Sequence, residues 1–237
     1  MTPSALQQFL ASRGLKPKKS LSQNFLIDAN VVEKALDIAE ICAHDAVLEI
    51  GPGPGAITER LLKRGASVIS VERDRDYPAT HHADILEFPL ETLPLHTKIV
   101  SNLPFHLTAP ILAKIVPFGF QSVTVFVQEE VARRMVAQPN TKEYGSFSLL
   151  LQFYAEVRYG FKVSKHCFYP RPNVEAAVVQ ILPKKRPDVE EESFFAMVHK
   201  AFQGRRKMLR RTLGFGGERR PENLSLQEFI ALHKEVS

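Results

Sequence analysis

Residues 46–55 read AVLEIGPGPG, a short apolar run that passes directly into three alternating glycines. A short, mostly apolar run of this kind is typical of a parallel strand that is buried on both faces. The glycines allow positive φ angles and a close approach of the backbone to a ligand, whereas a simple tight turn needs only one of them. Because open α/β sheets bind ligands beyond the carboxyl ends of their strands, we expect a ligand at this turn.

Further strands and helices alternate along the chain on either side of this turn. Thr2 and Asp28 are expected to cap two helices, and a third helix is expected over 57–64. The other expected strands are 67–71, 99–101, 123–127 and 176–181, the last belonging to an antiparallel pair. This alternation predicts an α/β fold in which helices cover both faces of a largely parallel sheet.

Two kinds of cofactor compete for the glycine turn. Gly51, Gly53 and Ala56 formally satisfy the dinucleotide pattern G-x-G-x-x-A. Pro52 and Pro54 argue against a dinucleotide, because proline lacks the backbone N–H that would cradle a pyrophosphate. The acid Glu49 before the turn would also repel phosphates and suit a cation. S-adenosyl-L-methionine has no phosphate and carries a sulfonium, so the residues favour it.

Two acids beyond the turn are candidate ligands for the rest of this cofactor. Glu72 ends the second strand, where a carboxylate can accept both ribose hydroxyls. Asp84 can accept from the adenine amine of the cofactor. The interval between the two acids contains Pro78 and is too short for the helix that usually joins parallel strands.

The segment Asn102-Leu103-Pro104-Phe105 follows the third strand and is similar to the (Asn/Asp)-x-Pro-(Tyr/Phe) motif of adenine-amino methyltransferases. The Asn102 oxygen and the Leu103 carbonyl can accept from an exocyclic adenine amine and direct its lone pair at the methyl donor. Phe105 offers a face on which an extruded base can stack, and Pro104 fixes the turn. This chemistry requires neither a side-chain nucleophile nor a metal.

The chain resembles, nearly end to end, the bacterial small-subunit ribosomal RNA adenine dimethyltransferases of the KsgA type. Ser22 replaces the usual glycine of that family, and Phe105 replaces its tyrosine. The resemblance rests on seven ordered motifs: residues 18–26 (KKSLSQNFL), 49–58 (EIGPGPGAIT), 102–105 (NLPF), 128–134 (QEEVARR), 168–174 (FYPRPNV), 205–209 (RRKML) and 220–225 (RPENLS).

This resemblance implies a fold and a set of site residues. The fold is a Rossmann-like class I methyltransferase domain with a small C-terminal α-helical domain. The catalytic residues are Asn102, Leu103, Pro104, Phe105 and Phe168, of which Phe168 touches the target base. In this family residues 18–26 close over the cofactor, which implicates Gln23, Asn24 and Leu26. The other expected cofactor-binding residues are Glu49, Gly51, Gly53, Gly55, Glu72, Asp84 and Asn102.

The resemblance also implies an activity, the transfer of four methyl groups to two adjacent adenosines in the 3′-terminal hairpin of 16S rRNA. The substrate would be an immature small ribosomal subunit. Two alternatives remain open: an enzyme of large-subunit rRNA that confers antibiotic resistance, and an assembly factor that acts mainly by binding and release. A nicotinamide oxidoreductase is a more distant alternative.

Composition and charge divide the chain into two parts near Pro183. We interpret residues 183–187 (PKKRP) as a linker, and therefore expect a methyltransferase domain over 1–183 and a small helical RNA-binding domain over 184–237. Eight basic residues and a single acid, Glu218, lie within 200–220, and this excess is typical of a phosphate-binding surface. The expected RNA-binding residues are Lys18, Lys19, Arg205, Arg206, Lys207, Arg210 and Arg211.

Composition excludes several classes of protein. The chain has 237 residues, 44% of them hydrophobic and 24% charged, which rules out disorder throughout. Cys42 and Cys167 match no metal or redox spacing. No secretory signal is visible, and the longest apolar runs are far too short to cross a bilayer. We therefore expect a cytoplasmic, monomeric protein without a membrane partner or a metal.

Overall fold

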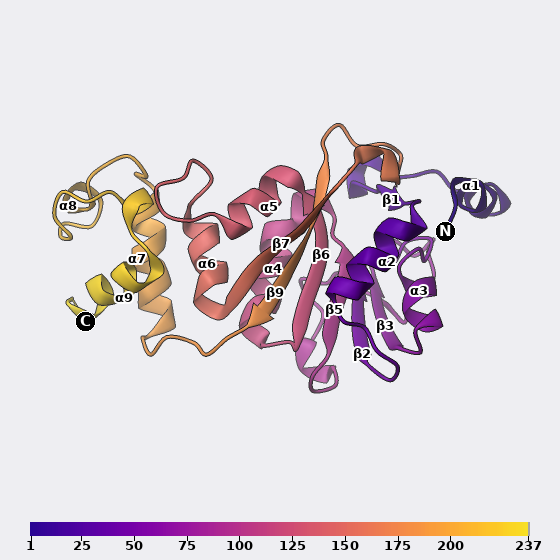
Figure 1. Ribbon diagram of the computed structural model, residues 1–237, viewed down its shortest axis with the longest axis horizontal. Helices are drawn as coiled ribbons and strands as arrows, with labels where there is room; N and C mark the ends of the chain where they lie inside the picture. The colour runs from indigo at the N-terminus through magenta and orange to yellow at the C-terminus, as the bar shows by residue number, and fades with distance from the viewer. Residues whose placement is uncertain (237) are drawn as a thin grey trace. The chain divides into compact units, whose positions relative to one another are not determined.

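The computed structural model describes residues 1–236, apart from the side chain of Lys19. It divides into two compact units, Met1–Ala132 with Arg158–Pro183, and Arg133–Val157 with Lys184–Ser237. The first contains the sheet and the second contains helices (Figure 1). The boundary after Pro183 coincides with the one expected from the sequence, whereas residues 133–157 join the C-terminal helices. The division into functional domains remains a prediction.

The first unit is built on a seven-stranded sheet in the order β4-β3-β2-β5-β6-β9-β7. Pairs β3–β4, β2–β3, β2–β5 and β5–β6 are parallel, and β6–β9 is antiparallel. The expected α/β architecture is thereby confirmed. The strands are β2 (Ala46–Ile50), β3 (Ser67–Glu72), β4 (His81–His82), β5 (Lys98–Asn102), β6 (Ser122–Gln128), β7 (Ala155–Val163) and β9 (Ala176–Pro183).

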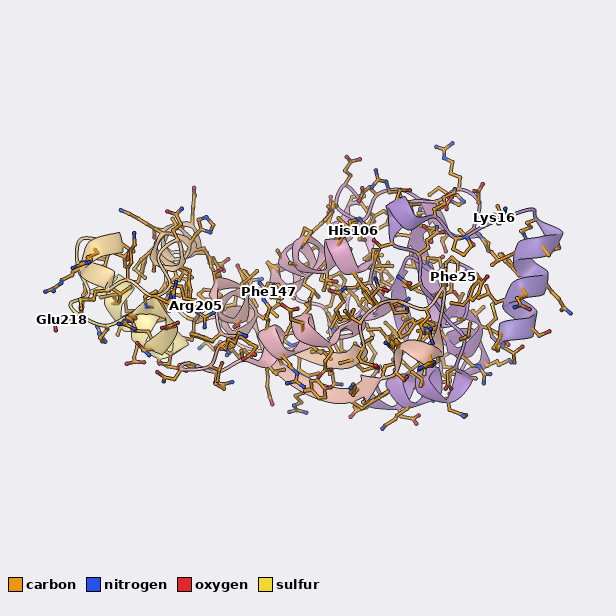
Figure 2. The ribbon with its side chains drawn as sticks, turned by 90° about the horizontal axis from the view of Figure 1, so that it is seen from above. Lys16, Phe25, His106, Phe147, Arg205 and Glu218 are labelled. Atoms are coloured by element: carbon orange, nitrogen blue, oxygen red, sulfur yellow. The ribbon has the colours of Figure 1, made fainter. Side chains whose placement is uncertain are left out.

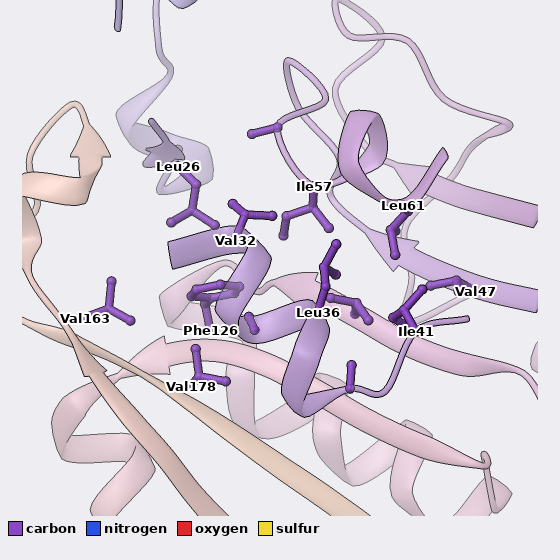
Figure 3. Packing of buried hydrophobic residues seen from close by; sticks show 14 of the residues in the cluster. Leu26, Val32, Leu36, Ile41, Val47, Ile57, Leu61, Phe126, Val163 and Val178 are labelled. Carbon is purple, nitrogen blue, oxygen red and sulfur yellow. The ribbon is translucent and has the colours of Figure 1, made fainter. Parts of the chain in front are cut away.

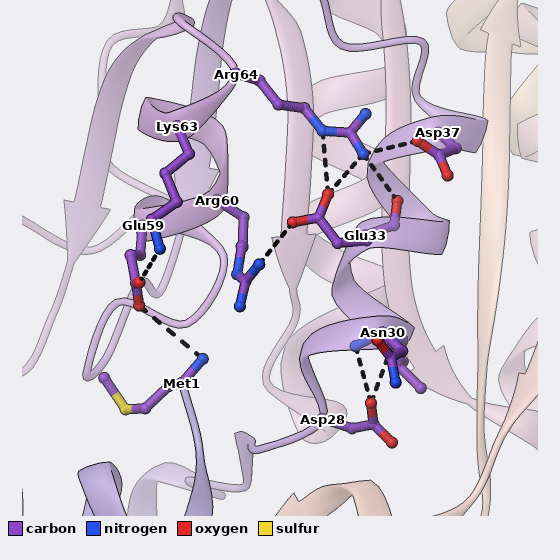
Figure 4. Close-up of polar contacts among 10 residues, drawn as sticks. Met1, Asp28, Asn30, Glu33, Asp37, Glu59, Arg60, Lys63 and Arg64 are labelled. Atoms are coloured by element: carbon purple, nitrogen blue, oxygen red, sulfur yellow. Dashed lines mark hydrogen bonds and ion pairs between the residues drawn. The ribbon is translucent and has the colours of Figure 1, made fainter.

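Helices of the first unit begin and pack as the sequence predicts. The Asp28 side chain caps α2, since its Oδ1 accepts from the Asn30 N–H at 2.9 Å (Figure 4). Glu33 of α2 accepts from Arg60 at 3.0 Å and from Arg64 at 2.7 Å, which ties α2 to α3. The helices are α1 (Pro3–Ser12), α2 (Ala29–Ile38), α3 (Thr58–Lys63) and α4 (Thr108–Ile115), and α5 (Glu129–Val136) begins in the first unit and ends in the second.

Apolar side chains of α2 and α3 form one core cluster with the central strands. Val32 and Leu36 of α2 pack with Leu61 of α3 and with Val47 of β2, and all four are at most 1% exposed (Figure 3). Phe126 of β6 and Val178 of β9 belong to the same cluster. Burial of such side chains contributes about 1.5–3 kcal/mol each, so this cluster holds β2 and its glycine turn in place.

A short connection joins β3 to β4 without a helix. Residues 73–80 lead directly to β4, which pairs in parallel with β3 at Val71↔His81 and Glu72↔His82. The Thr80 N–H donates to Ser70 Oγ at 2.9 Å, and the Ser70 N–H donates to Thr80 Oγ1 at 3.2 Å. The connection brings Asp74, Asp76 and Tyr77 into a tight loop after Glu72.

A small second sheet pairs two segments that lie far apart in the sequence. Strand β1 (Phe25–Leu26) is antiparallel to β8 (Phe168–Tyr169), with Phe25 opposite Tyr169 and Leu26 opposite Phe168. Residues directly opposite each other present their side chains on the same face. Leu26 and Phe168 both enter the core cluster, while Phe25 enters a second cluster with Leu6, Leu10 and Tyr77.

The second unit contains helices α6 (Ser146–Tyr154), α7 (Glu191–Phe202), α8 (Leu209–Thr212) and α9 (Leu226–Lys234). Ser225 and Glu228 form the capping box that the sequence predicts at the start of α9. Within residues 1–236, no helix is long and apolar enough to span a membrane. The short 3-10 helices are Lys19–Leu21, Leu90–Thr92, Phe105–Leu107, Val116–Phe118, Lys165–Cys167 and Pro221–Asn223.

Candidate active site

A cavity opens at the carboxyl ends of β2, β3 and β5. Ligands of open α/β sheets bind at this edge. We call residues 18–25 the arm, and its residues 21–25 form one wall of the cavity. The lining residues are Leu21, Ser22, Gln23, Asn24, Phe25, Ile50, Gly51, Gly53, Val71, Glu72, Arg73, Ala83, Asp84, Ile85, Asn102, Leu103, Pro104, Phe105, His106, Leu107 and Ile111.

The glycine turn forms the floor of this cavity. Gly51 and Gly53 line it with φ angles of 69° and 51°, in the left-handed region that disfavours other residues. A Cβ atom on Gly53 would lie 2.9 Å from Cε1 of Phe25, so the arm packs directly on this glycine. Gly55 also has a positive φ, of 92°, but is not among the lining residues.

Glu72 and Asp84, the two acids expected to bind the cofactor, both reach the cavity wall. The Glu72 carboxylate accepts from the Asp74 N–H at 2.8 Å and from the Gly53 N–H at 3.1 Å. Burial raises the pKa of Glu72, and these backbone hydrogen bonds act in the opposite direction. Asp84 accepts from the Leu86 N–H at 2.9 Å and lies 3.5 Å from the Arg73 guanidinium. A carboxylate has about four acceptor positions, so the Glu72 oxygens retain capacity for two hydroxyls.

Glu49 lies behind the glycine turn and is 1% exposed, without lining the cavity. Its Oε2 accepts from the Thr58 hydroxyl at 2.5 Å. Burial raises its pKa to about 7, and the negative charge of Glu72 acts in the same direction. In this structure Glu49 supports the turn through Thr58, and its expected contact with the cofactor remains a prediction.

The raised pKa of Glu49 predicts a pH-dependent stability of the ligand-free protein. An unfolded glutamate has its ordinary pKa near 4.5, so the folded state binds this proton more tightly. Protonated Glu49 therefore contributes to the free energy of unfolding. This contribution is complete below about pH 4.5 and is lost as the pH rises through 7. Its upper limit is about 3 kcal/mol. Because an amide stays neutral, we expect the melting temperature of Glu49→Gln to rise relative to wild type between pH 5 and pH 8. Parallel melting curves across this range would contradict the assignment.

Asn102 lies at the end of β5, and a hydrogen bond fixes the orientation of its side-chain amide. Its Nδ2 donates to the Asn24 carbonyl at 2.8 Å, which fixes which side of the amide faces the cavity. Its Oδ1 is buried and has no hydrogen-bond partner among the described residues. An unpaired buried acceptor costs about 1–3 kcal/mol. This oxygen is therefore held ready for a donor that enters the cavity.

The aromatic residues of the expected site divide into two groups. Phe105 lines the cavity together with Leu103 and Pro104. Phe168 is only 2% exposed and lies in the core cluster, against which Phe105 packs. Phe168 is therefore placed behind the cavity wall, because its register opposite Leu26 turns it inward. Its contact with a target base remains a prediction.

The arm shows where the expected cofactor ligands of the N-terminal motif lie. Gln23 and Asn24 line the cavity, whereas Leu26 is 2% exposed in the core. Ser22 has a φ of 51°, which explains why the family that the chain resembles has glycine at this position. The Lys18 ammonium lies 2.7 Å from Asp74 Oδ1 and 2.7 Å from Asp76 Oδ2. Lys18, expected to bind RNA, is thus occupied within the protein, and the side chain of Lys19 lies outside the described residues.

Sequence reasoning missed several residues of this site. Phe25 and His106, both labelled in Figure 2, line the cavity together with Ile85. Asp74 connects the arm to the loop after β3. Asp74 follows Glu72 by two positions, and this spacing, together with the basic arm, was the available signal.

The basic residues of the second unit have different roles. Arg205, which Figure 2 labels in the second unit, is engaged within that unit. It donates to Glu222 at 3.0 Å and to the carbonyls of Thr141 and Lys142. Each side-chain nitrogen of Arg205 has a partner inside the unit, and the expected contact of Arg205 with RNA remains a prediction. Arg210 pairs with Glu218 at 3.1 Å on the surface. Within the described part of the chain, Arg206, Lys207 and Arg211 are exposed and form no ion pair.

Known proteins provide an independent comparison. Residues 14–237 match the family described as Ribosomal RNA adenine dimethylase. The chain is 41% identical to "Ribosomal RNA small subunit methyltransferase A" of Protochlamydia amoebophila (strain UWE25), over 99% of this chain and 96% of that protein. It is also 41% identical to the protein of the same name from Chlamydia felis (strain Fe/C-56), over 100% and 95%. Both alignments are longer than 237 residues, so these relatives have additional residues inside the aligned region.

Solved structures share the fold. A dimethyladenosine transferase from Plasmodium falciparum superposes with a TM-score of 0.77 at 20% identity, covering 89% of this chain and 96% of that one. The 23S rRNA methyltransferase ErmE superposes with a TM-score of 0.68 at 23% identity, covering 90% and 99%. These similarities extend over both units of the chain.

Proposed function

Since the chain belongs to the ribosomal RNA adenine dimethylase family, we propose that its cavity holds one extruded adenosine of ribosomal RNA beside the methyl donor. The protein is a 16S rRNA adenine dimethyltransferase that uses S-adenosyl-L-methionine. Its relatives are named for the small subunit, so neither the large-subunit alternative nor a binding-only role is favoured. We propose further that two adjacent adenosines of the 3′-terminal hairpin are modified in an immature small subunit, by a cytoplasmic monomer.

The unpaired Oδ1 of Asn102 is the observation that carries this proposal. An adenine amine has two N–H groups and a lone pair that is delocalised into the ring. Donation of one N–H to Asn102 and of the other to the Leu103 carbonyl favours a pyramidal nitrogen with an available lone pair. Both acceptors are fixed before the substrate arrives, because Asn102 is held by the Asn24 carbonyl and the Leu103 N–H donates to Phe126. Such preorganisation stabilises the positive charge that develops on the nitrogen.

The remaining cavity residues suit the proposed donor. S-adenosyl-L-methionine supplies an electrophilic methyl group on a sulfonium. Glu72 has acceptor positions left for ribose hydroxyls, and Gly51 and Gly53 provide a floor without side chains. Phe105 closes the side next to Asn102 and can stack on the target base. The apolar and aromatic walls exclude water from the reacting groups.

Formation of N6,N6-dimethyladenosine tests the proposal directly. The purified protein is incubated with labelled S-adenosyl-L-methionine and undermethylated small subunits, and the rRNA is digested to nucleosides. We expect labelled dimethyladenosine from the 3′-terminal hairpin. Label confined to large-subunit rRNA, or no dimethyladenosine at all, would contradict the proposal.

Three exposed basic residues of the second unit are proposed to contact RNA phosphates. We expect Arg206→Glu, Lys207→Glu and Arg211→Glu each to weaken rRNA binding several-fold. Each is also expected to reduce the slope of log affinity against log salt by about one. Lys63→Glu on α3 makes the same charge change in the sheet unit and serves as the matched control. The slopes of log affinity against log salt are measured by filter binding from 50 to 300 mM salt. Equal slopes for all four variants would show that these three residues do not contact RNA phosphates.

A further inference from the structure

The arm is joined to the loop after β3 by one buried acid, Asp74. Its side chain is 3% exposed, and its two oxygens accept from different arm residues. Oδ1 accepts from the Lys18 ammonium at 2.7 Å, and Oδ2 accepts from the Gln23 amide at 2.8 Å. The Lys18 N–H in turn donates to Gln23 Oε1 at 2.7 Å, which closes a three-residue network.

The same residue also touches the cofactor side of the cavity. The Asp74 backbone N–H donates to Glu72 Oε1, and Glu72 Oε2 accepts from the Gly53 N–H. A continuous chain of hydrogen bonds therefore runs from the arm through Asp74 and Glu72 to the glycine turn. Opening of the arm removes two partners from a buried carboxylate that lies two residues from the proposed ribose ligand.

Apolar contacts fix the arm at a second point. Tyr77, from the same loop as Asp74, is 2% exposed and packs with Leu6, Leu10 and Phe25. Its ring centroid lies 5.4 Å from that of Phe25. Phe25 in turn covers Gly53. Residues 74–77 thus contact both ends of the arm, Lys18 through Asp74 and Phe25 through Tyr77.

The charge on Asp74 persists in this setting. Burial opposes its ionisation, but the hydrogen bonds from Lys18 and Gln23 outweigh burial, so its pKa is lowered. Lys18 is 43% exposed, so water can reach its ion pair with Asp74.

We propose that Asp74 is a positioning residue that fastens the arm over the cavity and thereby sets the affinity for S-adenosyl-L-methionine. The inference rests on the proposed function of the cavity, and it adds a residue that none of the motifs assigns. Asp74 acts through Gln23, Asn24 and Glu72, which line the cavity, and does not itself take part in methyl transfer. Closure of this kind sequesters the ligand, and opening allows the product to leave.

Asp74→Asn and Asp76→Asn are a matched pair for testing this role. Each substitution removes one negative charge from the same loop and one acidic partner of Lys18. However, Asp76 is 44% exposed and lacks the contacts with Gln23 and Glu72. Binding of S-adenosyl-L-methionine to the full chain is measured by titration calorimetry without RNA. We expect the dissociation constant to rise about tenfold in Asp74→Asn and less than about twofold in Asp76→Asn. Lys18→Met should behave like Asp74→Asn, and Lys18→Arg should stay close to wild type.

Two further measurements separate positioning from a structural role. The KM for S-adenosyl-L-methionine should rise while kcat at saturating donor stays unchanged. Amides of residues 18–25 should exchange faster in Asp74→Asn, while those of β2 and β3 keep their protection. Wild-type affinity in Asp74→Asn, or lost protection in β2 and β3, would overturn the proposal. A wild-type protein that fails to bind S-adenosyl-L-methionine would instead contradict the proposed function of the cavity.

Discussion

Asn102→Ala is expected to lower kcat for adenine methylation by about 10²- to 10³-fold, because it removes the preorganised acceptor for the target amine. The buried Oδ1 has no other partner among the described residues, so its function lies in the complex with RNA. Affinity for the methyl donor should change only a few-fold, through loss of the contact with the Asn24 carbonyl. Single-turnover methylation of undermethylated small subunits measures the rate, and calorimetry measures donor binding.

Asn102→Asp is the control for this prediction. It keeps an acceptor oxygen at the same position but cannot donate to the Asn24 carbonyl. We expect it to retain at least about tenfold more activity than the alanine variant. A rate for Asn102→Ala within about threefold of wild type would show that the amide oxygen does not assist the reaction.

Gly53→Ala is expected to weaken donor binding by about a hundredfold. The added Cβ would meet Phe25 at 2.9 Å, and the backbone has a φ of 51° that alanine disfavours by about 1–2 kcal/mol. Phe25 is wedged between Gly53 and Tyr77, so relief of the clash displaces the arm. Titration calorimetry measures the loss of affinity.

Gly119→Ala separates backbone strain from the displacement of the arm. Gly119 has a φ of 82° and no atom within 4 Å of an added Cβ, and it is not among the residues that line the cavity. It should lower the melting temperature by a few degrees and leave donor affinity unchanged. If Gly53→Ala bound the donor as tightly as Gly119→Ala, the packing of the arm on the glycine turn would be irrelevant to binding.

The sequence predicts those parts of the molecule that local pattern determines. Strands β2, β3, β5 and β6 are apolar runs, and the glycine turn and the Asn102 motif follow two of them directly. Their positions at the carboxyl edge follow from the parallel order of the sheet. The strand pattern therefore sufficed to bring Gly51, Glu72 and Asn102 to one cavity.

The contacts that the sequence does not predict join distant residues. Glu72, Asp74 and Asp76 follow one another at intervals of two residues, so spacing alone does not distinguish their roles. Only the folded structure shows that Asp74 accepts hydrogen bonds from both Lys18 and Gln23. Arg205 resembles its basic neighbours in sequence, yet Glu222 and two carbonyls engage it within the second unit. The inward face of Phe168 likewise depends on its register with Leu26, which no local pattern encodes.

The two outer strands of the large sheet bear on how the protein behaves at high concentration. An uncovered strand edge is a template on which another chain can add, and natural proteins shorten or charge such edges. Strand β4 offers only two residues, and the opposite edge, β7, carries Glu156, Arg158 and Lys162 at exposed positions. Neither edge strand favours pairing with a strand of a neighbouring molecule, so we expect concentrated solutions to resist fibre formation.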